Sequence, residues 1–182
     1  MALSSTSRSG LRTTTPPPAD RIPNWLALPP DVTTAILHKV GAADTLMSAQ
    51  KVCTTWRRTC KEPSMWRVID TNTWRDLFSA PGGALVKRCK LAVDMSQGLL
   101  VDICIHSLAT DDLLLYIAHR SSQLRHLRLV YCDAVSSEGV SQAVKKLPLL
   151  EELHLYYTPI AKEAIEVVGR CCPLLKSFKL NR

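Results

Sequence analysis

The residues best suited to chemistry are a cysteine and three histidines in the second half of the chain. Cys104 and His106 are two positions apart, and His126 and His154 follow in later segments. Thiol and imidazole groups are common zinc ligands, and a thiol beside a histidine is also the arrangement of a cysteine nucleophile. However, their spacing matches no known zinc motif, and nothing evident orients a base or forms an oxyanion hole. We therefore expect no metal, no cofactor and no catalytic residue.

Other sequence features exclude several further classes of protein. There is no phosphate-binding glycine loop, no G-x-S-x-G elbow and no H-E-x-x-H motif. The net charge is +7, but lysine and arginine never form a run longer than two, so nucleic-acid binding is not expected. The apolar runs are far shorter than the roughly 18 residues of a membrane span. Seven cysteines without a C-x-x-C pair indicate a reducing compartment, the nucleus or the cytoplasm.

The first two segments of the chain differ sharply in composition. Residues 1–20 are rich in serine, threonine and proline and are expected to form a disordered tail, although a transit peptide has a similar composition. From residue 28 to residue 66, apolar residues recur every three or four positions, which predicts short helices. The first should end at Gly41, and the second should begin after a capping Asp44. The third should run from about Arg57 to Lys61 and end before Pro63. Helices this short need each other or a partner for stability.

The third segment repeats the pattern L-x-x-L-x-L. Copies begin at Leu100, Leu124, Leu150 and Leu175, at spacings of 24, 26 and 25 residues. These spacings lie within the range of about 20 to 29 residues found in leucine-rich repeats. Each copy predicts a strand, a turn and a covering helix. We therefore predict an α/β solenoid of about four repeats, with parallel strands on the concave face and helices outside, and without a C-terminal cap after Leu180.

The helical segment resembles the F-box family. The residues that carry this resemblance are Leu28 to Asp31, Ile36 and Leu37, Asp44 to Leu46, Val52 to Arg57, and Ser64 to Arg67. Behind it, Cys132 and Cys172 fit the cysteine-containing subclass of leucine-rich repeats that often follows an F-box. The whole chain is therefore similar to plant F-box proteins with leucine-rich repeats, as a short or truncated member.

This resemblance implies domains, partners and a function. Residues 1–20 would be the tail, residues 21–70 an all-α three-helix F-box, and residues 71–182 the repeats. In the family, the F-box binds a Skp-type adaptor protein, which links it to a cullin and to ubiquitin transfer. The chain would then be a non-catalytic ligase subunit that presents an unknown target protein. The residues that would face the adaptor or set the helices are Leu28, Pro29, Ile36, Leu37, Val52 and Trp56.

The polar positions between the strand leucines are predicted to lie on the concave face and to bind the target. These candidates are Asp102, His106, His126, Arg128, Glu152, His154, Tyr156 and Lys179. The alternative is that they are ordinary solvated strand residues, whose cross-strand pairs contribute at most about 1 kcal/mol each. Two other functions remain open at this point: a repeat-based scaffold independent of ubiquitin, and a truncated form that occupies the adaptor without delivering targets.

Overall fold

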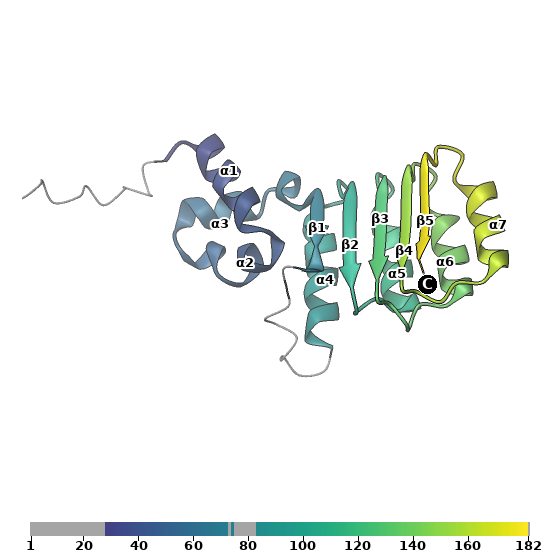
Figure 1. Cartoon of the computed structure of the whole chain (residues 1–182). Coiled ribbons are helices and arrows are strands. Elements are labelled where there is room, and N and C mark those ends of the chain that lie inside the picture. The colour runs from purple at the N-terminus through teal and green to yellow at the C-terminus, as the bar shows by residue number, and fades with distance from the viewer. Residues whose placement is uncertain (1–27, 73, 75–82, 182) are drawn as a thin grey trace, which may run out of the picture.

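The computed structural model describes residues 28–72, 74 and 83–181. Within these ranges, a group of short helices is followed by a five-stranded parallel sheet with helices on one of its faces (Figure 1). The predicted tail, residues 1–20, lies outside the described residues, as does the start of the predicted F-box. No helix of the described part is long and apolar enough to cross a membrane.

Three short α-helices form the N-terminal group. They are α1 (Pro30–Val40), α2 (Ala42–Met47) and α3 (Thr54–Cys60), with the 3₁₀ turns η2 (Ala49–Lys51) and η3 (Pro63–Trp66) after α2 and α3. Proline at the first position of α1 suits a helix start, because the amide that proline lacks would have no partner there. Gly41 ends α1, as the sequence predicts.

The second and third helices begin earlier than the sequence predicts. α2 starts directly after Gly41, so Asp44 lies inside the helix and does not cap it. The φ of Gly41 is +88°, which lets the chain change direction within one residue, and no separate capping residue is needed. The third helix starts at Thr54, where Cys53 caps it by accepting a hydrogen bond from the Trp56 amide at 3.4 Å.

The sheet is built in the order of the sequence. Its strands are β1 (Val68–Asp70), β2 (Asp102–His106), β3 (His126–Val130), β4 (Glu152–Tyr156) and β5 (Ser177–Asn181). All neighbours pair in parallel and in register, so Cys104, Arg128, His154 and Lys179 lie in one row across the sheet. The last four strands are those that the repeated leucines predict.

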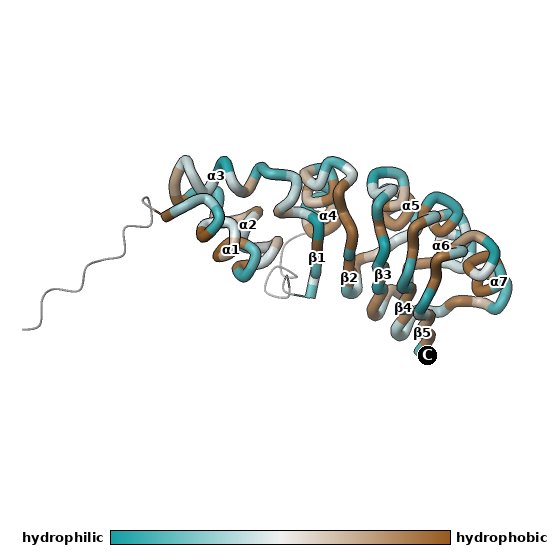
Figure 2. The backbone as a smooth tube through the Cα atoms, turned by 90° about the horizontal axis from the view of Figure 1, so that it is seen from above, coloured by the Kyte–Doolittle hydropathy of each residue, from teal (hydrophilic) through white to brown (hydrophobic). Residues whose placement is uncertain are grey.

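Helices connect the strands, because parallel neighbours require a crossover. They are α4 (Ala84–Met95), α5 (Asp111–Arg120), α6 (Ser137–Val144) and α7 (Lys162–Cys171). Seen from above, the helices lie along one side of the row of strands (Figure 2). The core lies between these two layers and includes Ile103, Leu127 and Leu153 at equal positions of adjacent strands, each at most 1% exposed. Burying each such side chain contributes about 1.5–3 kcal/mol.

Helices α5 and α6 are joined by hydrogen bonds at their N-termini. The Asp111 carboxylate accepts hydrogen bonds from the Ser136 amide at 2.8 Å and from the Ser136 hydroxyl at 2.6 Å. The same hydroxyl oxygen accepts a hydrogen bond from the Gly139 amide at 3.0 Å and so caps α6. A Cβ on Gly139 would lie only 2.0 Å from Asp111 Oδ1. Position 139 is therefore restricted to glycine by the neighbouring carboxylate.

A residue with positive φ follows each of the strands β2, β3 and β4. These residues are Ser107 at 58°, Tyr131 at 54° and Tyr157 at 51°. The amide of each donates a hydrogen bond to the last residue of the next strand, at 2.7 to 2.9 Å. The rings of Tyr131 and Tyr157 stack with centroids 4.6 Å apart. The ladder of the sheet thus continues one residue beyond each of these strands.

Two elements, β1 and α4, were not expected from the sequence. β1 lies within the range predicted for the F-box, residues 21–70, yet it pairs with β2 along its whole length. The boundary predicted after residue 70 therefore falls between two neighbouring strands of one sheet. Because of β1, Asp70 and Thr71 lie beside the last residues of β2.

Candidate functional site

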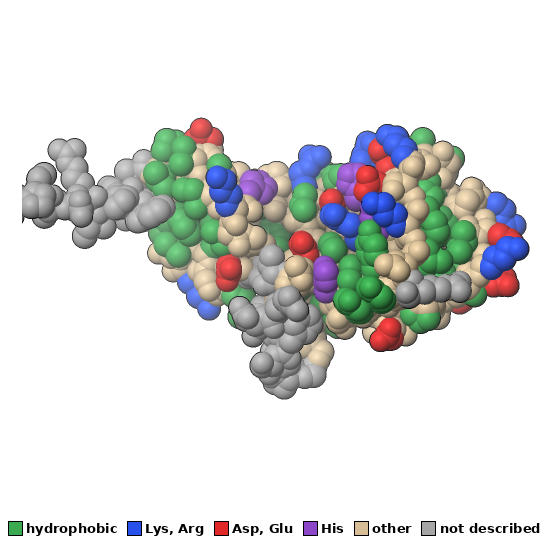
Figure 3. Space-filling view, viewed as in Figure 1, with side chains coloured by type: hydrophobic (Ala, Val, Ile, Leu, Met, Phe, Trp, Pro, Cys, Tyr) green, Lys and Arg blue, Asp and Glu red, His purple; other side chains and the backbone are tan. Residues whose placement is uncertain are grey.

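The first candidate site is an apolar surface on the N-terminal helices, which we call the helical surface. It consists of Leu28, Pro29, Val32, Ile36 and Val52. Val52 is 57% exposed and Val32 is 40% exposed, although both are aliphatic. Figure 3 shows hydrophobic side chains gathered over this end of the molecule. Apolar side chains that remain exposed on a group of helices are typical of a protein interaction site.

The other two residues predicted to act in adaptor binding occupy inner positions. Leu37 is completely buried in the core, and Trp56 is half-buried against it. From these inner positions the two side chains can fix the helices relative to one another, and they offer little surface to a partner. Trp66, which is 1% exposed, donates a hydrogen bond from Nε1 to the Cys60 carbonyl at 2.9 Å and so fixes η3 against α3.

The second candidate site is the sheet face opposite the helices, which we call the open face. Side chains alternate between the two faces along a strand, so the first, third and fifth residues of β2 to β5 share this face. They are Asp102, Cys104, His106, His126, Arg128, Val130, Glu152, His154, Tyr156, Ser177, Lys179 and Asn181. The structure thus brings all eight predicted target-site residues to one face.

The centre of the open face carries a group of paired charges. Arg128 Nη2 lies 2.7 and 2.9 Å from the two carboxylate oxygens of Asp102. His126 Nδ1 lies 3.4 Å from the same carboxylate. These contacts link β2 to β3. They also leave Arg128 with a partner of opposite charge within the face.

His154 is less accessible than the sequence suggests. Only 7% of it is exposed, and its Nε2 lies 3.0 Å from the Ser177 hydroxyl. The pKa of His154 is lowered, first by burial of the ring and then by the positive charge of Lys179. The neutral ring therefore fills space between β4 and β5, and it offers little surface to a target.

A charged ladder that the sequence analysis did not single out precedes β3, β4 and β5. The Glu151 carboxylate accepts hydrogen bonds from Arg125 and from Lys176 Nζ, the latter at 2.6 Å. These two cations lower the pKa of Glu151, with Lys176 contributing most. Arg125, Glu151 and Lys176 each directly precede a strand, and the repeat spacing shows this equivalence. The sequence does not show that their side chains would meet.

A hollow at the other end of the strands was also not expected. It lies beside the exposed Tyr157 ring and has a volume of about 700 Å³. The residues that line it are Asp133, Ser137, Tyr157, Thr158, Pro159, Ile160 and Ala161. It lies at the loops that follow β3 and β4, and none of the predicted target-site residues lines it.

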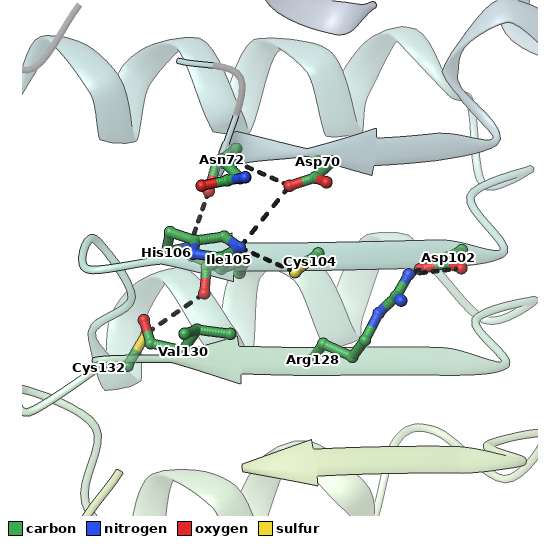
Figure 4. A network of polar contacts seen from close by, with 10 residues as sticks. Asp70, Asn72, Asp102, Cys104, Ile105, His106, Arg128, Val130 and Cys132 are labelled. Carbon is green, nitrogen blue, oxygen red and sulfur yellow. Dashed lines mark hydrogen bonds and ion pairs between the residues drawn. The ribbon is translucent and has the colours of Figure 1, made fainter. Parts of the chain in front are cut away.

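A compact polar cluster lies on the open face, where β1 and β2 end (Figure 4). His106 Nε2 lies 3.2 Å from Cys104 Sγ and 3.8 Å from Asp70 Oδ1. The pKa of the Cys104 thiol is raised to about 11, first by burial and then by the negative charge of Asp70. His126 and His154 have other partners, so the four residues considered for a metal site do not form one cluster. Asp70 takes their place beside Cys104 and His106.

The polar cluster is not arranged as a catalytic relay. In a relay, one imidazole nitrogen faces the thiol and the other faces the carboxylate. In this cluster, Nε2 of His106 faces both Cys104 and Asp70. The contacts therefore give no support to a cysteine nucleophile with an oriented base.

Comparison with known proteins identifies the helical part. Residues 25–72 match the family model described as F-box-like. The range includes α1, α2, α3 and β1, so it covers the whole helical surface. The helical surface thus lies within a recognised domain.

Relatives from Arabidopsis thaliana extend the similarity to the sheet. F-box protein SKIP19 is 52% identical over 159 residues, which are 87% of this chain and 52% of the relative. Putative F-box/LRR-repeat protein 23 is 46% identical over 89% of this chain and 36% of its own length. For putative F-box/LRR-repeat protein 9 the identity is 47%, over 87% of this chain and 65% of the relative. The chain spans only part of these relatives, and it belongs to the plant F-box proteins with leucine-rich repeats.

Proposed function

We propose that this chain is the substrate-recognition adaptor subunit of a ubiquitin ligase of the Skp-cullin-F-box type. In this proposal, the helical surface binds a Skp-type adaptor protein, and that adaptor connects the chain to a cullin. The open face holds a target protein for ubiquitination. The chain itself supplies no catalytic residue, since its task is to hold two other proteins in proximity.

The observation that carries this proposal is the exposed apolar side chain of Val52 within the F-box-like domain. Val52 is 57% exposed and lies between η2 and α3, shortly before the half-buried Trp56 of α3. Covering apolar area releases about 25 cal/mol for each square ångström removed from water. A partner that covers Val52 therefore gains affinity from surface that the chain alone leaves in water.

The open face supports the second half of the proposal. It combines Arg128, Tyr156 and Lys179 with the acidic Glu152. Arginine and tyrosine are enriched at protein interfaces, and paired charges of both signs can select a complementary partner. The in-register strands hold these side chains at fixed spacings, which suits recognition of a folded protein surface.

The finer architecture that we propose is a leucine-rich-repeat solenoid of the cysteine-containing subclass. Cys132, in the turn after β3, is 1% exposed, and its Sγ lies 3.4 Å from the Val130 carbonyl and 3.6 Å from the Ile105 carbonyl. A small buried thiol thus satisfies backbone acceptors in a tight turn. This contact gives a structural reason for a cysteine at that place in a repeat.

We place the protein in the nucleus or the cytoplasm. All seven cysteines lie within the described residues and are free. Free cysteines that pack as small apolar side chains suit a reducing compartment. Fluorescence microscopy of the tagged chain in plant cells tests this placement, and a secreted protein would contradict it.

The adaptor half of the proposal is tested by equilibrium binding between the purified chain and a purified Skp-type adaptor. Val52→Asp would bring a charge into an apolar interface, which costs about 2 kcal/mol or more and weakens binding at least about 30-fold. Leu28→Ala combined with Pro29→Ala should weaken binding as well, because these residues begin the helical surface. Val52 is exposed, so its replacement should leave the fold intact.

Leu174→Asp is the matched control for the adaptor experiment. Leu174 is an aliphatic residue that is 47% exposed and follows α7, at the other end of the sheet from α1 to α3 (Figure 1), so its replacement should leave adaptor binding unchanged. If the folded wild-type chain does not bind the adaptor, or if Val52→Asp binds equally well, the ligase proposal is wrong. The scaffold interpretation would then be preferred.

A further inference from the structure

Three potential metal ligands converge on the open face, outside the helical surface. His106 Nε2 lies 3.2 Å from Cys104 Sγ and 3.8 Å from Asp70 Oδ1, and all three donor atoms lie within 4.8 Å of one another. In a tetrahedral zinc site with bonds of about 2.0–2.3 Å, neighbouring donors are separated by about 3.3–3.7 Å. Two of the separations in the cluster are already close to this range. Rotation of the exposed Asp70 side chain can adjust the third.

The direction of the histidine ring distinguishes a ligand set from an ordinary hydrogen-bonded pair. One nitrogen, Nε2, points at both the sulfur and the carboxylate oxygen (Figure 4). A single hydrogen bond to Cys104 would not require the carboxylate to approach the same nitrogen. A cation placed between the three atoms would use all of them at once.

The backbone holds these ligands in place before any metal binds. Asp70 and Cys104 are direct partners in the register of β1 and β2, and His106 follows Cys104 on the same face. The Thr71 hydroxyl accepts a hydrogen bond from the His106 amide at 2.8 Å. The Asn72 amide donates to Asp70 Oδ1 at 2.8 Å. The first contact fixes the backbone of His106, and the second orients the Asp70 carboxylate, as contacts from outside a ligand set do in metal sites.

The charges around the cluster permit a divalent cation. A thiolate and a carboxylate together carry two negative charges, which balance the two positive charges of the metal. Arg128 is the nearest cation, but its guanidinium is paired with Asp102 at 2.7 and 2.9 Å. In Figure 4, this side chain extends towards Asp102 and away from His106. Asp102 thus compensates the charge that would otherwise oppose metal binding.

We propose that Asp70, Cys104 and His106 form a binding site for a zinc ion. A set of sulfur, nitrogen and oxygen donors suits zinc, whereas magnesium and calcium prefer oxygen donors alone. The metal replaces the thiol proton, so one proton is released for each zinc ion bound. Three protein ligands leave the fourth position open towards the exposed side of the cluster. The site does not depend on the proposed function, because it requires neither adaptor nor target.

The consequence for the fold is a link between β1 and β2. β1 has only three residues and directly follows the F-box-like helices. A metal held by Asp70 from β1 and by two residues of β2 would fasten the helical part to the sheet. Zinc should therefore raise the thermal unfolding midpoint of the chain.

The test uses the whole purified chain, reduced and freed of metal by a chelator. Zinc affinity is measured by competition with a chromophoric chelator, and cobalt is titrated as a spectroscopic probe. We expect one zinc ion per chain with a Kd below about 1 μM, and a thiolate-to-cobalt absorption band. Cys104→Ala, His106→Gln and Asp70→Asn should each weaken binding at least about tenfold, and Cys104→Ala should abolish the band.

Two controls and one fold-neutral variant keep the proposal falsifiable. Cys171→Ser and His126→Gln remove a half-buried thiol and an open-face imidazole outside the cluster, and they should retain zinc affinity. Asp70→Asn preserves the shape of an exposed side chain, so loss of binding in this variant cannot be attributed to misfolding. If the wild-type chain binds no zinc in the micromolar range, or if the three ligand variants bind as tightly as the controls, the proposal is overturned.

Discussion

Replacing Gly139 with alanine tests the hydrogen-bonded junction between α5 and α6. An added Cβ would lie 2.0 Å from Asp111 Oδ1 and 2.3 Å from its Cγ, so the carboxylate must move. Its movement breaks the hydrogen bonds from the Ser136 amide and hydroxyl. Alanine by itself favours a helix over glycine by up to about 1 kcal/mol. The two effects have opposite signs, and their magnitudes decide the outcome.

The lost hydrogen bonds should outweigh the helix preference. Hydrogen bonds to charged groups contribute about 1.5–3 kcal/mol each, and the exposure of Ser136 reduces this to about 1 kcal/mol each. Gly139→Ala should then lower the free energy of unfolding by about 1 kcal/mol. With Asp111→Ala already present, only a 3.0 Å contact with the Asp111 Cβ remains, which a small shift relieves. In that background the same change should raise the free energy of unfolding.

The assay is urea unfolding of the wild type, both single variants and the double variant, followed by circular dichroism. The expected coupling between the two positions is about 2 kcal/mol, well above the 0.3–0.5 kcal/mol deviation typical of independent sites. The reasoning is refuted if Gly139→Ala stabilises the wild-type chain. It is also refuted if the two changes are additive.

Two further predictions concern buried rings. Trp66 and Trp74 are both 1% exposed. Of these two side chains, Trp66 has a hydrogen-bond partner for its Nε1, whereas Trp74 Nε1 has none among the described residues. Trp66→Phe should therefore lower the free energy of unfolding by about 1 kcal/mol more than Trp74→Phe does. Equal losses in urea unfolding would show that the bond to the Cys60 carbonyl contributes nothing. His154 has a pKa below its ordinary value, so the unfolded chain binds its proton first, and the wild type loses stability as the pH falls from about 6.5 towards the lowered pKa. His154→Gln should lose less stability between pH 7.5 and pH 5, and parallel curves for the two proteins would contradict this.

The repeated leucines predicted the strands because a buried parallel strand needs its apolar residues at fixed positions. Ile103, Leu127, Leu153 and Phe178 proved to be partners in one row, so the spacing of the copies determined the register as well. The helix starts were harder to predict. The N-terminal boundary of α2 depends on the backbone conformation of Gly41, which composition does not reveal.

The elements that sequence reasoning missed have weak local signals. β1 has three residues, and only Ile69 is buried, so no alternation can be recognised. α4 buries Cys89, Ala92 and Val93, a narrow stripe of small side chains. The cluster around His106 depends on β1, so it could not be predicted either. Its ligands are brought together by strand pairing between residues that are distant in the sequence.

The stacked rings of Tyr131 and Tyr157 show a property of the whole sheet. Each strand pairs with its neighbour in the same register, so residues at equivalent positions of successive repeats lie side by side, as the 4.6 Å between the two ring centroids illustrates. A side chain in such an array touches the same position in the neighbouring strand, as Tyr131 and Tyr157 do, or a nearby one, as Arg128 and Asp102 do. A substitution therefore has a short range along the row, and the open face can change its chemistry one strand at a time while the leucine core stays the same.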